Sequence, residues 1–215
     1  MPGRLITIEG LDGAGKSTLA TALAAALRER GVALELLREP GGVEVSERLR
    51  DLVKDPALTI GARAEALIYA AARAQLVEER VRPLLDGGTW VLLDRFVDSS
   101  LAYQGAARGL GVDRVAAINA FGTGGLVADR TLLLRVDPAV GRARQAGRDE
   151  HPDRLEREDA SFFDAIAAAY DELADEHPER FRVIDAAQPA DRVLASGLAA
   201  LADLAPAALE SRSDQ

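Results

Sequence analysis

The chain has 215 residues, of which 48% are hydrophobic, and it contains no cysteine. This composition supports a sizeable buried core, which excludes global disorder, and it excludes disulfides, thiolate metal sites and a cysteine nucleophile. The net charge of −9, from 35 acidic and 26 basic residues, argues against a broad basic surface for nucleic acid.

The apolar run Leu5–Ile8 is too short for a signal peptide, and no stretch approaches the roughly 18 apolar residues of a membrane span. We therefore expect a cytoplasmic protein with neither a nucleic acid nor a membrane as partner. One domain over residues 1–208 is expected, with a C-terminal tail at 209–215.

Apolar β-rich runs alternate with Ala/Leu-rich helical patterns along the chain. In chain order the pattern predicts strand Leu5–Glu9, helix Ser17–Arg30, strand Ala33–Leu37, helices Glu44–Lys54 and Ala62–Leu85, strand Trp90–Leu93, helices Leu101–Ala107 and Val112–Phe121, strand Thr131–Val136, a helix from Asp137-Pro138, helix Phe162–Glu176, strand Phe181–Ile184 and helix Arg192–Leu204. This alternation predicts an α/β fold with a five-stranded parallel sheet flanked by helices on both faces.

Between the first strand and first helix, Gly10-Leu-Asp-Gly-Ala-Gly-Lys-Ser17 matches the phosphate-loop pattern G-x-x-x-x-G-K-[ST]. Only Lys16 and Lys54 are lysines among the 26 basic residues, so a lysine at this position looks chemically required. The pattern predicts an ATP site, with Lys16 on the β- and γ-phosphates and Ser17 on Mg²⁺. The predicted ATP-binding residues here are Gly10, Leu11, Asp12, Gly13, Ala14, Gly15, Lys16, Ser17 and Thr18. The alternative is a glycine-rich structural turn.

Charged residues follow the second and third strands, at the sheet edge where ligands of such folds bind. Asp94 can hold Mg²⁺ as a second metal residue beside Ser17, and Arg95 and Arg38 can hold the phosphate of an acceptor. The alternative for Asp94 is a strand-end cap. For Arg38 it is a salt bridge to Glu39 or Glu44.

Five arginines lie between residues 142 and 157, a segment with little apolar content. We interpret it as an exposed, mobile insert that acts as a lid, with arginines that neutralise the negative charge of a transferring phosphoryl group. The alternative is a solvated charged loop.

The chain resembles thymidylate kinases from Ile6 to about Val193. The strings that carry the resemblance are Ile8–Ser17, Arg38–Gly42, Tyr69–Gln75, Asp94–Phe96, Ser99–Gly105, Asp153–Glu156 and Asp185–Pro189. The resemblance implies a P-loop NTPase fold of the nucleoside monophosphate kinase type, transfer of the γ-phosphoryl of ATP to dTMP, Mg²⁺ as cofactor and a homodimer.

Residue roles also follow from the resemblance. Arg73 would donate to thymine O4, and Tyr69 would stack on the base in place of the usual Phe. Ser100 and Gln104 would contact the base edge, and Tyr103 would disfavour a 2′-hydroxyl on the sugar. Arg38 and Arg95 would hold the monophosphate, and Asp12 would face the sugar 3′-OH or the metal. The phosphate loop has no basic residue at its variable positions, so the chain resembles members with a lid arginine. Arg154 matches that position best and Arg148 second, while Arg142 and Arg148 would bind ATP. The proposed catalytic set is Lys16, Arg95, Arg154 and Asp12.

Each residue has an ordinary structural alternative. Tyr69 and Tyr103 can be core aromatics, and Arg73 and Gln75 can lie on a solvated helix face. Two other activities remain open: a kinase for another nucleoside monophosphate, and a P-loop ATPase switch without such an acceptor.

Overall fold

The computed structural model describes residues 3–147 and 153–204. Its centre is one parallel sheet in the order β2-β3-β1-β4-β5. The strands are β1 Leu5–Gly10, β2 Leu34–Arg38, β3 Trp90–Asp94, β4 Arg130–Arg135 and β5 Phe181–Asp185. The five predicted strands and their parallel arrangement are confirmed, with ends shifted by one residue.

Helices connect the strands. They are α1 Lys16–Glu29, α2 Glu44–Lys54, α3 Ala62–Leu76, η1 Val77–Val81, α4 Arg82–Asp86, α5 Val97–Ser100, η2 Leu101–Ala107, α6 Val112–Thr123, α7 Pro138–Ala146, α8 Ala160–Glu176 and α9 Ala190–Ala199. The single helix expected over 62–85 contains a π-helical turn, η1, and the 101–107 segment is π-helical throughout. The last helix ends at Ala199, before the expected Leu204. No helix in residues 3–147 and 153–204 is long and apolar enough to cross a membrane.

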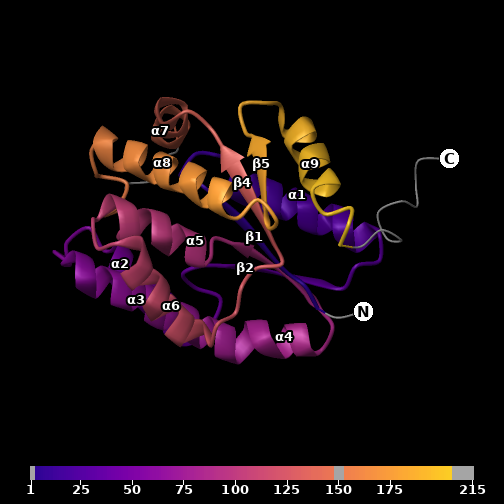
Figure 1. The fold of residues 1–215 in the computed structure, drawn as a ribbon, viewed down its shortest axis with the longest axis horizontal. Helices are drawn as coiled ribbons and strands as arrows, with labels where there is room; N and C mark the ends of the chain where they lie inside the picture. The colour runs from indigo at the N-terminus through magenta and orange to yellow at the C-terminus, as the bar shows by residue number, and fades with distance from the viewer. Residues whose placement is uncertain (1–2, 148–152, 205–215) are drawn as a thin grey trace.

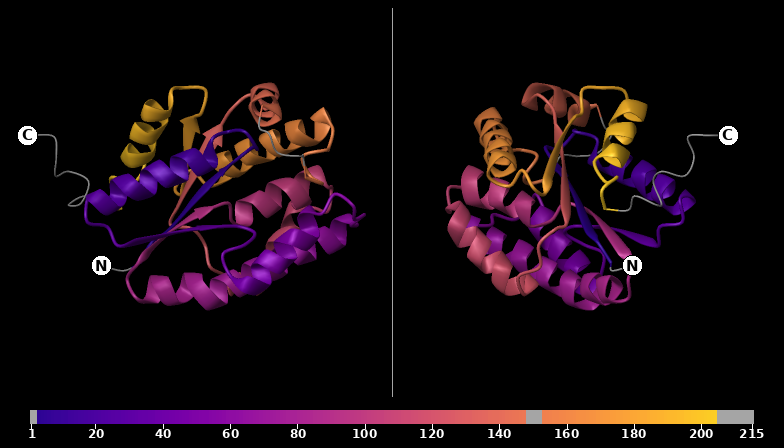
Figure 2. Two further views of the ribbon diagram at one scale, coloured as in Figure 1. Left: turned by 180° about the vertical axis from the view of Figure 1, so that it is seen from behind. Right: turned by 45° about the vertical axis from the view of Figure 1, so that its right-hand side comes forward.

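The two faces of the sheet carry different helices, as Figures 1 and 2 show. Helices α1 and α9 cover one face, where Ile6 and Ile8 of β1 are buried against Leu23 and Leu27. The opposite face packs against α3–α4 and against η2 with α8. Because side chains alternate along a strand and every position of β1 is buried, β1 contributes to both cores, with Leu5 on the face opposite to Ile6 and Ile8.

The strand order changes direction at β1, since β2 and β3 lie on one side of it and β4 and β5 on the other. In register, Ile8 is opposite Asp94, and Arg38 is opposite Asp94. The carboxyl ends of β1, β2 and β3 therefore meet at one edge. This is the position at which open α/β sheets bind ligands.

The predicted insert at 142–157 is only partly as expected. Arg142–Ala146 continue helix α7. Asp153 and Arg154 are partly buried, so the expectation of a fully exposed segment is wrong for them, because Lys54 and Glu65 bind their side chains. Residues 148–152, including Arg148, and the tail at 209–215 lie outside the described residues.

Candidate functional site

The loop between β1 and α1 depends on glycines for its path. Gly10 has φ 135°, and an added Cβ would lie 2.5 Å from the Leu134 carbonyl oxygen. Gly13 has φ 79°, and its Cβ would lie 2.0 Å from the Gly141 carbonyl oxygen. Among the described residues no side chain caps α1, so its first N–H groups remain available for an anion.

Lys16 is buried in this loop, with 7% of its side chain exposed. Its Nζ donates to the Leu11 carbonyl oxygen at 2.8 Å and lies 3.7 Å from Asp12 Oδ1. Burial, together with the nearby Arg95 charge, lowers the pKa of Lys16 to about 8. A phosphate placed beside the ammonium group would restore its charge, since a nearby negative charge favours the protonated form.

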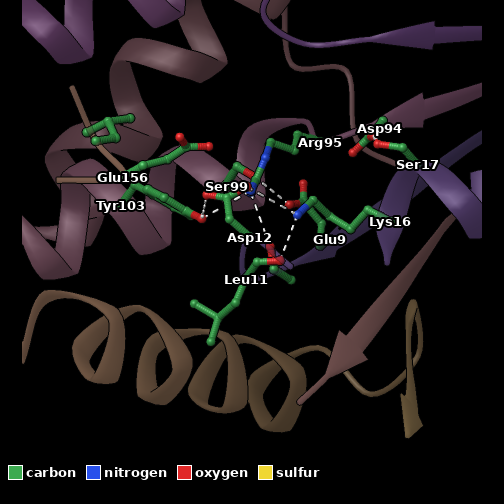
Figure 3. Close-up of polar contacts among 12 residues, drawn as sticks. Glu9, Leu11, Asp12, Lys16, Ser17, Asp94, Arg95, Ser99, Tyr103 and Glu156 are labelled. Carbon is green, nitrogen blue, oxygen red and sulfur yellow. Dashed lines mark hydrogen bonds and ion pairs between the residues drawn. The ribbon is translucent and has the colours of Figure 1, made fainter. Parts of the chain in front are cut away.

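Arg95, Asp12 and Tyr103 converge at the mouth of the loop, as Figure 3 shows. Arg95 Nη2 donates to Asp12 Oδ1 at 2.6 Å, and the Tyr103 hydroxyl donates to Asp12 Oδ2 at 3.1 Å. Burial opposes the charge of Asp12, but Arg95 and Lys16 outweigh it and hold its pKa well below the usual range. The three groups form a rigid charged cluster at the end of β1.

The backbone of Arg95 is strained. In the described part of the chain it is the non-glycine residue with positive φ, at 73°, a conformation that costs about 1–2 kcal/mol. Glu9 supports the turn, because its carboxyl group accepts from the Phe96 N–H at 2.7 Å and from the Tyr170 hydroxyl at 2.8 Å. Burial and the charge of Asp98 raise the pKa of Glu9. Strain of this kind is typical of functional positions.

Ser17 and Asp94 bring two oxygen ligands together. The Ser17 hydroxyl donates to Asp94 Oδ2 at 2.8 Å. Hydroxyl and carboxylate oxygens suit Mg²⁺, which binds proteins through one or two carboxylates and completes its shell with water and substrate phosphates. No group of three or more His, Cys, Asp or Glu residues in the described ranges could hold a metal ion. The residues present therefore fit a Mg²⁺ ion that arrives with a nucleotide.

Arg73, on α3, is buried at 2% exposure and satisfies four acceptors. Its Nε donates to Glu39 Oε2 at 2.6 Å, its Nη1 to Ser100 Oγ at 2.9 Å and to Asn119 Oδ1, and its Nη2 to the Phe96 carbonyl oxygen at 3.0 Å. A guanidinium has five N–H donors, so one remains, on Nη2. The alternative of a solvated helix face is wrong for Arg73.

From the sequence, Glu39 was considered only within a string and as a possible salt-bridge partner of Arg38, but it is the buried partner of Arg73. Its Oε1 is enclosed and has no hydrogen-bond partner among the described residues. Burial raises the pKa of Glu39 to about 7, although Arg73 opposes the shift. Local sequence motifs could not predict the pairing of Glu39 with Arg73, because the two residues lie 34 positions apart.

We expect Glu39→Gln to reduce the pH dependence of stability. The native pKa of about 7 exceeds the ordinary glutamate pKa of 4.5, so the native state holds more protons between those values and the unfolding free energy falls as pH rises through that window. The effect is on the order of 3 kcal/mol. Thermal unfolding from pH 5 to pH 8 should show a smaller loss of Tm in the variant than in the wild type. Parallel curves would contradict this assignment.

One cavity of about 290 Å³ joins these groups. The predicted residues that line it are Asp12, Gly13, Gly15, Lys16, Ser17, Thr18, Arg38, Tyr69, Arg73, Asp94, Arg95, Ser100, Tyr103 and Gln104. The phosphate loop, the strand-end arginines and the α3 and η2 side chains thus face the same space. Arg38 is bound to Glu47 at 3.0 Å, so neither Glu39 nor Glu44 is its partner.

Several predicted residues do not line this cavity. Gly10 belongs to the loop without lining the cavity, Ala14 packs in the core beneath α1, and the Leu11 side chain packs in the core near α8. Arg142 lies 6.0 Å from the centre of the Phe163 ring. Arg154 donates to Glu65 and to the Val53 carbonyl oxygen. Their predicted roles in ATP binding and catalysis stay predictions.

The sequence analysis missed other lining residues, which are Glu39, Pro40, Arg50, Lys54, Ser99, Asp153, Leu155 and Glu156. Arg50 is the most informative of them, since its Nη1 donates to the Pro40 carbonyl oxygen at 2.9 Å, and burial and Arg38 lower its pKa. In a chain whose cations are nearly all arginine, one more arginine on an amphipathic helix carries no distinguishing signal.

Comparison with known proteins adds a second line of argument. The sequence profile of the family described as thymidylate kinase matches residues 8–196. Similar proteins include the thymidylate kinases of Halorhodospira halophila, 48% identical over 95% of this chain and 96% of the relative, and of Deinococcus radiodurans, 47% identical over 94% and 97%. That of Lactobacillus delbrueckii subsp. bulgaricus is 47% identical over 92% and 95%.

Proposed function

The chain belongs to the thymidylate kinase family, and from this membership we propose that it transfers the γ-phosphoryl group of ATP to dTMP, giving dTDP and ADP in dTTP biosynthesis. One observation carries the proposal: a single cavity contains the phosphate loop and, buried beyond it, Arg73 and Gln104. A donor triphosphate and an acceptor base can then be held in one cavity.

On the donor side, the glycine loop and the uncapped start of α1 receive the phosphates of ATP. Lys16 neutralises charge on the transferring group, and it can turn from the Leu11 carbonyl oxygen to do so. Ser17 and Asp94 hold Mg²⁺, which supplies additional charge neutralisation when bound. The Mg²⁺ assignment rests on the oxygen ligands of these two residues.

On the acceptor side, Arg95 and Arg38 hold the monophosphate at the carboxyl ends of β3 and β2. Phosphate is ionised at neutral pH, so its oxygen attacks the γ-phosphorus without a strong general base. Asp12 keeps Arg95 in place and faces the sugar. Tyr103, bound by both of these residues, would crowd a 2′-hydroxyl.

The base is read deeper in the cavity. Arg73 has one N–H left for thymine O4, and Ser100, which accepts from Arg73, has its own O–H available as a donor. Tyr69 lies along the same cavity and can pack on the base. Arg73 and Ser100 are held in place by hydrogen bonds within the fold, which lowers the entropy cost of binding.

A coupled assay of ADP release tests the function. Purified protein is given ATP, Mg²⁺ and one of dTMP, dUMP, CMP, GMP or AMP. We expect turnover with dTMP to exceed that with each of the others, and release without an acceptor to be slow. Equal turnover without any monophosphate would support an ATPase switch, and preference for another monophosphate would reassign the acceptor.

Arg154 remains the candidate lid arginine, although in this structure it is bound to Glu65 at 2.6 Å. We expect Arg154→Ala to lower kcat by about 10²-fold or more while changing the KM for dTMP little, because an arginine acts on transition-state charge. Arg144→Ala is the matched control, since Arg144 lies in the same segment and donates to the Ala186 carbonyl oxygen. An unchanged kcat in Arg154→Ala would remove this role.

We also propose a homodimer formed through the α2, α3 and α6 layer. Phe121 of α6 is 92% exposed and Leu67 of α3 is 56% exposed, and large apolar side chains so exposed mark interaction surfaces when they cluster. Sedimentation should show Phe121→Asp as a monomer, while Val183→Asp, an exposed apolar position on β5, stays dimeric. A monomeric wild type would contradict the proposal.

The cytoplasmic location, the single domain over 1–208 and the lid at 142–157 stay predictions. Limited proteolysis would test the lid, which should be protected when both nucleotides are bound.

A further inference from the structure

Glu65 is a buried carboxylate that sequence reasoning did not single out. It lies on α3 with none of its surface exposed, and both of its oxygens are saturated. Oε1 accepts from Gln104 Nε2 at 3.0 Å and from Arg108 Nε at 3.3 Å. Oε2 accepts from Arg108 Nη2 at 3.2 Å and from Arg154 Nη2 at 2.6 Å.

These contacts fix the direction of the Gln104 carboxamide. A carboxylate flanked by two guanidinium groups can only accept hydrogen bonds, so the amide nitrogen of Gln104 must face Glu65. The reverse orientation would bring two acceptor oxygens together and leave them unsatisfied, which costs about 1–3 kcal/mol. The amide oxygen is then the group that Gln104 can present to the cavity that it lines.

An amide oxygen facing the cavity favours a base that offers a hydrogen-bond donor. A 4-keto pyrimidine such as thymine carries an N3–H donor beside its O4 acceptor, whereas cytosine carries an N3 acceptor beside an amino group. Arg73 and Gln104 both line the cavity, so the remaining Arg73 N–H and the Gln104 oxygen can serve as the donor and the acceptor that the keto form requires. Cytosine would instead place its amino donor against the Arg73 N–H donor and its N3 acceptor against the Gln104 oxygen acceptor.

We propose that Glu65 is a specificity-determining positioning residue, which selects 4-keto over 4-amino pyrimidine monophosphates by holding the Gln104 carboxamide oxygen toward the base. This rests on the proposed function, because it needs a pyrimidine monophosphate in the cavity. Glu65 itself touches no substrate and acts through Gln104.

Glu65→Gln is the direct test, because a glutamine of the same size can offer either an amide nitrogen or an oxygen to Gln104 and no longer dictates its direction. The ratio of kcat/KM for dTMP to that for dCMP should fall by about tenfold or more. The KM for dTMP should rise, whereas a change of kcat through Arg154, which Glu65 also binds, affects both substrates alike and cancels in the ratio. This ratio does not depend on the concentration of folded enzyme, so partial unfolding does not disturb it.

Glu158→Gln is the matched control. Glu158 binds Arg108 at 2.7 Å from the other side, so this variant removes a carboxylate partner of Arg108 without touching Gln104. We expect it to leave the dTMP/dCMP ratio unchanged. A fall equal to that of Glu65→Gln would overturn the proposal, since Arg108 and not Gln104 would then be responsible.

Gln104→Met provides an independent test that keeps Glu65 with its two arginines. It should lower the same ratio to the level of Glu65→Gln, and the double variant should fall no further. Full selectivity in Gln104→Met, or in a folded Glu65→Gln, would overturn the proposal. A wild type that does not use dTMP at all would instead refute the proposed function.

Discussion

Lys16→Met should lower kcat by about 10³-fold, because the variant loses a cation that stabilises the charge on the transferring phosphoryl group. Methionine keeps the length of the side chain and loses the charge. Lys16 is the lysine of the phosphate loop and lies buried beside Asp12. Single-turnover measurement of dTDP formation at saturating ATP gives the rate of the chemical step.

The control for this variant is Arg80→Met, which removes an exposed cation bound to Glu35 far from the loop. It should leave kcat within about twofold, since surface ion pairs contribute little. A kcat for Lys16→Met within tenfold of the wild type would show that the loop lysine does not act on the transferring group.

Arg73→Met should destabilise the fold by about 3–5 kcal/mol, because it leaves the Glu39 carboxylate buried without its cation. It should also raise the KM for dTMP, since the remaining N–H for the base is lost with the guanidinium. Urea unfolding measures the first effect and steady-state kinetics the second.

The double variant Arg73→Met/Glu39→Gln separates these two roles. A neutral glutamine no longer needs a cation, so at least half of the lost stability should return, while the KM for dTMP stays high. If the KM recovers together with the stability, Arg73 has a structural role alone and the base is read by other groups.

The fold could be predicted in large part because its signals are local. Strands such as β1 and β3 are mostly apolar runs that end at Gly10 and Asp94, a composition typical of strands buried on both faces. The expectation of one helix over 62–85 was wrong in detail, since the π-helical turn at 77–81 adjusts the register in a way that apolar periodicity does not reveal.

The candidate site also has residues that could be predicted from local motifs and residues that could not. Lys16, Ser17 and Asp94 follow from motifs within one loop or strand end, where the backbone conformation and the chemistry are set by neighbouring residues. The placement of Arg142 on Phe163 and of Arg154 on Glu65 could not be predicted, because it depends on which distant side chains come close. The same holds for Arg50, which lines the cavity from α2, a helix that packs against α3.

The sequence by itself determined the class of fold, the donor-phosphate loop and the family, because each is written in contiguous residues with a fixed backbone role. Only the tertiary structure decided that Arg73 has one donor left, that Glu39 is its buried counter-charge and that Glu65 orients Gln104. Each of these properties depends on hydrogen-bond partners that come from separate helices and loops. A buried polar group acts through the partners that surround it, and these are set by packing between segments far apart in the chain.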